Sequence, residues 1–122
     1  MALALDVVKG GFSAGQARAI GGQVQSAVSA AGTTISDATA LTASINVVTT
    51  TGSGAGVKLP DCEIGDSIEV LNSGANSLTV YPPTTSDTIN QLSAGGGFLL
   101  GTNTACKLRR FTASKFIAWL SA

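Results

Sequence analysis

Residues 11–15 (GFSAG) match the G-x-S-x-G spacing of a catalytic serine turn. In that motif the serine lies between a buried strand and a helix, and a histidine takes its proton. The sequence contains no histidine. The same letters fit a helix N-cap at Ser13, with Gln16 completing a capping box. We therefore expect no catalytic residues and no enzyme activity.

Two other segments contain residue types that bind phosphate or calcium. Residues 52–56 (GSGAG) lack the lysine and the serine or threonine of a phosphate-binding loop. Asp61, Glu63 and Asp66 lack the ligand spacing and the distal glutamate of a calcium loop. We interpret residues 52–56 as a linker between strands and the three acids as surface residues, and we expect no metal and no cofactor.

The two cysteines, Cys62 and Cys106, have no C-x-x-C spacing, and the chain offers no histidine as a further zinc ligand. A disulfide is geometrically possible if their strands are neighbours. We favour two small buried thiols in a protein that assembles in a reducing cytoplasm.

The composition indicates one small domain with few charges. Of its 122 residues, 11% are charged, whereas about a quarter are charged in an ordinary soluble domain. We therefore expect other chains to cover part of the surface. Because the formal net charge is +0, we expect no binding to nucleic acid. No segment approaches the roughly 18 apolar residues that cross a bilayer, and the start lacks the basic region of a signal peptide.

The charged residues form two clusters along the sequence. The acidic cluster comprises Asp61, Glu63, Asp66 and Glu69, and the basic cluster comprises Lys107, Arg109, Arg110 and Lys115. Three arrangements are open: the clusters meet within the fold, they meet across a subunit boundary, or they form two separate solvated faces.

Alternating apolar residues and β-branched residues predict short strands from residue 33 onward. The expected strands are 45–49, 57–59, 66–72, 77–81, 88–90, 98–100, 106–111 and 115–120. Six to eight short strands at regular spacing, with no convincing helix between them, favour an all-β domain, a small β-sandwich or a jelly-roll-like barrel over residues 33–122. We interpret 66–72 and 77–81 as a β-hairpin around Gly74, closed by Pro82 and Pro83.

Residues 1–32 are expected to form an N-terminal arm, because they contain too few large apolar side chains to fold alone. Apolar residues at helical spacing suggest a short helix over 13–31, but Gly21 and Gly22 would destabilise it by about 1 kcal/mol each. Helical and extended arms both remain open. In either case the arm gains order on a partner, and its expected contact residues are Phe12, Ile20, Val24 and Val28.

The strand 115–120 is apolar on both faces. Phe116, Ala118 and Leu120 alternate with Ile117 and Trp119. Because only one face of a strand in a two-layer domain meets the core, we predict that Ile117 and Trp119 contact another chain.

The segment 57–90, with V-K-L-P, G-D-S-I-E-V-L-N-S-G-A-N-S-L-T-V-Y-P-P and T-I-N, resembles small virion proteins of tailed phages when taken together with F-I-A-W-L at 116–120. These are head-decoration (cement) proteins and modules of tail or head fibres. The resemblance covers roughly residues 33–122 and brings no catalytic residues.

The resemblance implies a structural protein of the virion, assembled in the host cytoplasm, that binds the major capsid protein and stabilises the head. It also implies a homo-oligomer, with a trimer preferred because such proteins often sit on threefold axes. No small-molecule substrate and no membrane are expected. The alternative is a fibre module that recognises a host-surface glycan through Tyr81 or Trp119.

Overall fold

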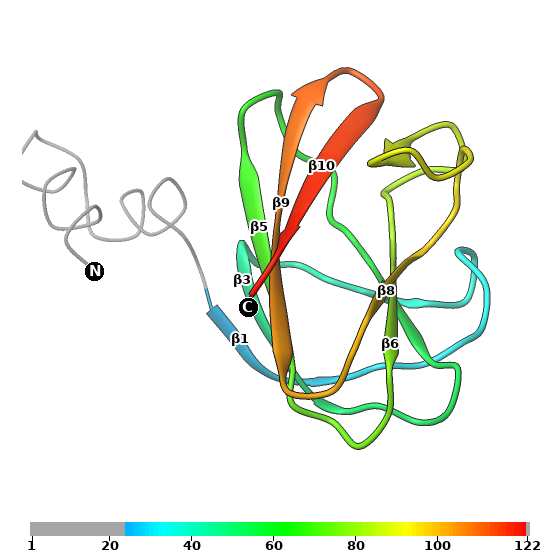
Figure 1. Cartoon of the computed structure of the whole chain (residues 1–122), viewed down its shortest axis with the longest axis vertical. Helices are drawn as coiled ribbons and strands as arrows, with labels where there is room; N and C mark the ends of the chain where they lie inside the picture. Colours follow the sequence, from blue (N-terminus) through cyan, green and yellow to red (C-terminus); the bar gives the residue numbers. More distant parts are fainter. Residues whose placement is uncertain (1–23, 122) are drawn as a thin grey trace, which may run out of the picture.

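The computed structural model describes residues 24–121, and these residues form ten β-strands and no helix. The prediction of an all-β fold is therefore confirmed, with more strands than the six to eight expected. A six-stranded sheet contains, in spatial order, β1 (Val24–Ser29), β3 (Ile45–Thr50), β5 (Ser67–Asn72), β9 (Thr104–Thr112), β10 (Lys115–Leu120) and β7 (Thr88–Ile89). A four-stranded sheet contains β2 (Thr39–Ala40), β4 (Gly56–Lys58), β6 (Leu78–Tyr81) and β8 (Phe98–Leu100) (Figure 1).

The chain alternates between the two sheets over its first six strands. As a result β1, β3 and β5 are parallel neighbours in one sheet, and β2, β4 and β6 are parallel neighbours in the other. Each passage through both sheets forms one coil, so the strand path is solenoid-like. The antiparallel strand β9 then covers the edge of β5, β10 pairs with the other edge of β9, and β8 covers the edge of β6.

One apolar core joins the two sheets. Along β5 every second side chain is buried, including Ile68 and Val70, and β9 adds the buried Cys106 and Leu108. Val57 and Val80, from the smaller sheet, belong to the same buried cluster. Since the side chains of a strand alternate between its two faces, the residues between these positions point away from the core.

The strands β5 and β6 are found where the sequence predicts them, but they do not form a hairpin. They lie in different sheets, and the segment between them crosses from one sheet to the other. The fully buried Asn72 explains this path, because its side chain replaces the hydrogen bonds of a hairpin turn. Its Oδ1 accepts from the Thr51 hydroxyl (2.9 Å) and from the backbone N–H of Gly74 (3.0 Å). Its Nδ2 donates to the carbonyl oxygens of Asn76 (2.9 Å) and Leu100 (3.1 Å).

The end of the expected arm is a strand rather than a helix. Residues 24–29 form β1, which pairs in parallel with β3. Val24 and Val28 are four residues apart, and this spacing fits a helix as well as it fits the irregular strand found here, whose register shifts twice. Val28, expected as a contact with another chain, is 2% exposed and packs in the core of its own chain. Residues 13–23 of the predicted helix lie outside the described part of the chain.

Tyr81 ties the smaller sheet to the loop before β2. Its hydroxyl donates to the carbonyl oxygen of Thr33 (2.9 Å). Its ring lies against the backbone of Gly56 and Gly97, where an added Cβ would come within 2.6 Å and 3.1 Å of ring carbons. Only glycine leaves room for the ring at these two positions.

Candidate interaction surfaces

Two of the segments considered for chemistry lie within residues 24–121. The G-x-S-x-G segment at 11–15 lies outside that range. Residues 52–55 belong to the turn that connects β3 to β4, in which Gly54 has a φ of +74°, and Gly56 is the first residue of β4. In the described part of the chain, no group of three or more His, Cys, Asp or Glu side chains could hold a metal ion. The same residues contain no helix that could span a membrane.

Both cysteines are free thiols. Cys106 is buried on β9, and burial raises its pKa to about 12. Cys62 is partly buried in the loop before β5, and burial also raises its pKa. Thiols with raised pKa values hold little thiolate at neutral pH, so neither cysteine is an activated nucleophile.

The acidic and basic clusters meet within the fold, and Arg110 is the centre of this contact. Its guanidinium donates to Asp61 Oδ1 (2.9 Å) and to the carbonyl oxygen of Cys62 (2.6 Å). Asp87, which is 3% exposed, lies 3.8 Å away, and the guanidinium sits over the ring of Phe116. The hydrogen bond that Arg110 donates to Asp61 raises the pKa of Arg110. Arg110 therefore ties the loop before β5 to β9 and to the segment before β7.

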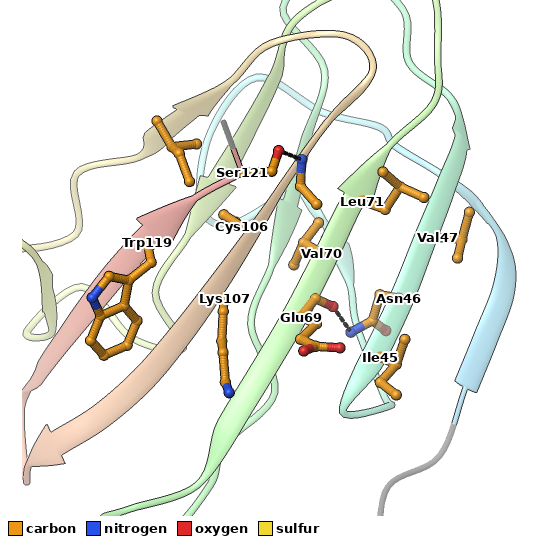
Figure 2. Close-up of a pocket in the computed structure, with 12 residues that line it drawn as sticks. Ile45, Asn46, Val47, Glu69, Val70, Leu71, Cys106, Lys107, Trp119 and Ser121 are labelled. Carbon is orange, nitrogen blue, oxygen red and sulfur yellow. Dashed lines mark hydrogen bonds between the residues drawn. The ribbon is translucent and has the colours of Figure 1, made fainter. Parts of the chain in front are cut away.

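The face of the six-stranded sheet that points away from the core carries apolar side chains around two charged ones at its centre. One row of directly paired residues crosses four strands, in the order Ile45, Glu69, Lys107 and Trp119. Figure 2 shows these side chains side by side across β3, β5, β9 and β10. A second row contains Val47, Leu71 and Ala105. We call these seven residues the outer face; they line a shallow depression of about 450 Å³.

Glu69 and Lys107 lie opposite each other on neighbouring strands without forming an ion pair. The ion pairs among residues 24–121 all involve Arg110. Both side chains are exposed, and Figure 2 shows the carboxylate and the ammonium apart from each other. The centre of the outer face thus presents one negative and one positive charge that are both available to another molecule.

A second apolar surface lies at the end of the two sheets, between β10 and β8. Residues of both strands and of the loop between β7 and β8 line a groove of about 880 Å³, which we call the end groove. Its exposed apolar side chains are Leu92 (40%), Leu99 (66%), Phe111 (49%) and Ile117 (39%). Phe98 is half-buried in its wall.

The predicted contact residues are distributed unevenly over these surfaces. Trp119 is 50% exposed on the outer face, and Ile117 is 39% exposed on the end groove. Val24 is 60% exposed on the edge strand β1. Phe12 and Ile20 lie outside the described residues.

The sequence analysis missed most of the end groove. Alternation within 98–100 could have placed Leu99 opposite its buried neighbour Leu100. Leu92 and Phe111 lie near Leu99 because β10 pairs with both β7 and β9. No local sequence pattern reveals this pairing.

No protein-family model, curated sequence or solved structure matches this chain at the significance that we required. The two surfaces themselves are therefore the basis for assigning a function.

Proposed function

We propose that this protein is a structural component of a tailed-phage particle, a decoration or cement protein that binds the major capsid protein and stabilises the head. The observation that carries the proposal is the end groove, where four large apolar side chains are exposed around one depression. Apolar surface gathered in this way is typical of a site that another protein covers. The resemblance of residues 33–122 to phage virion proteins supplies the identity of that partner.

The proposed mechanism is mechanical. A bound copy that contacts two neighbouring capsid subunits raises the free energy that is needed to separate these subunits. It therefore opposes the internal pressure of packaged DNA. We include in this proposal that the fold is the small β-sandwich expected from the sequence. The single core that the two sheets share supports it. Homo-oligomerisation and the location in the virion are also part of it.

Co-sedimentation with isolated heads of the phage that encodes the chain tests this function. Leu99→Glu places a charge on the end groove without touching the core, because Leu99 is 66% exposed. Ile64→Glu is the matched control, since Ile64 is 62% exposed and is not among the residues that line the groove. We expect Leu99→Glu to lower head occupancy at least tenfold and Ile64→Glu to bind like the wild type. Failure of the wild-type protein to bind heads, or equal loss in both variants, would remove this proposal.

The second candidate is a tail or head-fibre module that recognises a host-surface glycan. Trp119 favours it, because its half-exposed ring lies beside Lys107 and near Glu69, residue types that stack on a sugar and bind its hydroxyls. Tyr81 does not favour the fibre module, because its hydroxyl already donates a hydrogen bond to the carbonyl oxygen of Thr33. A glycan-array screen separates the candidates: saturable binding to one glycan that Trp119→Ala abolishes, without binding to heads, would favour the fibre module.

A further inference from the structure

We propose that the outer face binds the outer face of a second copy of this chain, related by a two-fold axis that runs along the strands midway between β5 and β9. This inference concerns the free protein in solution. It does not require a capsid, so its test is separate from the test of head binding. It also replaces the trimer expected from the resemblance with a dimer as the basic assembly.

The order of residues across the sheet makes this face complementary to itself. Ile45, Glu69, Lys107 and Trp119 occupy one row, with the proposed axis between the second and the third. A two-fold rotation about that axis reverses the row. Glu69 of each copy then lies over Lys107 of the other, and Trp119 of each copy lies over Ile45 of the other.

The second row is complementary to itself about the same axis. Leu71 pairs directly with Ala105 across the β5–β9 boundary, so the axis also passes between these residues. The rotation places the large Leu71 of one copy over the small Ala105 of the other. Apolar side chains therefore face apolar ones, with the large Leu71 over the small Ala105, and positive charges face negative ones, as a packed two-fold interface requires.

The charges favour a second copy over an unrelated apolar partner. An uncharged partner would cover Glu69 and Lys107 without supplying an opposite charge to either, at a desolvation cost of several kcal/mol for each ion. A second copy neutralises both, and it does so twice because each interaction occurs on both sides of the axis. Two sheets packed face to face with their strands nearly aligned is also a common arrangement of β-sheets.

A charge-exchange experiment tests this interface. Glu69→Lys gives a chain with two positive charges at the centre of the face, and Lys107→Glu gives a chain with two negative charges. In either homodimer like charges would face each other, so we expect each variant to raise the dimer dissociation constant at least tenfold. Mixing the two variants at equal concentration should restore a dimer, because each face then meets one of opposite charge.

Sedimentation equilibrium measures these outcomes against the 12.1 kDa mass of one chain. The controls are Glu63→Lys and Lys115→Glu, which change the net charge equally at exposed residues that are not part of the outer face. We expect twice the monomer mass for the wild type, for both controls and for the mixture. A monomeric or trimeric wild type, single variants that dimerise like the wild type, or a mixture that stays monomeric would each overturn the proposal.

Discussion

Replacing Asn72 by alanine should be the most damaging single change in the turn between β5 and β6. The amide makes four hydrogen bonds in a site with no exposed surface. A hydrogen bond contributes about 1 kcal/mol net, and a buried group left without its partner costs at least as much. Four such bonds give an expected loss of about 4 kcal/mol. A small domain has only about 5–15 kcal/mol of stability in total.

Asn76→Ala is the matched comparison, because it removes the same chemical group from the same turn. Its Nδ2 makes one hydrogen bond, to the carbonyl oxygen of Thr51 (2.9 Å), and the residue is exposed. We expect a loss of about 1 kcal/mol. Urea unfolding followed by tryptophan fluorescence gives both values from the midpoint and slope. If Asn72→Ala is no more destabilising than Asn76→Ala, the side-chain network does not determine how the chain crosses between the sheets.

Three further predictions concern stability. Gly56→Ala should destabilise the fold by about 1–3 kcal/mol, because the new methyl group meets an aromatic ring, whereas Gly52→Ala, with no atom within 4 Å, should leave the thermal midpoint nearly unchanged. Because burial raises the pKa of Cys106 to about 12 from 9.0, the unfolded chain loses this proton first as the pH rises. Stability should therefore fall above pH 9 by up to about 1.4 kcal/mol per pH unit more in the wild type than in Cys106→Ala, and urea midpoints that fall equally in both proteins above pH 9 would contradict this. Arg110→Ala leaves the buried Asp87 without its cation and should cost about 3 kcal/mol in calorimetry, a loss that Arg110→Ala/Asp87→Ala should partly recover.

The sequence predicted most strands because alternation is a local property. The segments 45–49, 98–100 and 115–120 were found almost at their expected bounds. Alternation does not say which sheet a strand joins, and so the hairpin around Gly74 was wrong. The strand β2 has two residues, too few for any periodic signal.

The outer face was predictable only in part. The alternation of 115–120 placed Ile117 and Trp119 away from the core, as found. Glu69 and Lys107 are neighbours because of the register between β5 and β9, two strands that are distant in the sequence. Local alternation does not predict this register. The sequence did not determine whether the acidic and basic clusters meet within the fold. The ion pair between Arg110 and Asp61 shows that they do.

The solenoid-like path also sets the order in which the protein can fold during synthesis. The parallel strands β1, β3 and β5 leave the ribosome before β9, which is the antiparallel partner of β5. Until β9 emerges, the nascent chain presents one edge of β5 with unpaired backbone groups, and such an edge can pair with any other extended chain. The time between the translation of β5 and of β9 is therefore the period of greatest aggregation risk, and translation through β6, β7 and β8 determines how long it lasts.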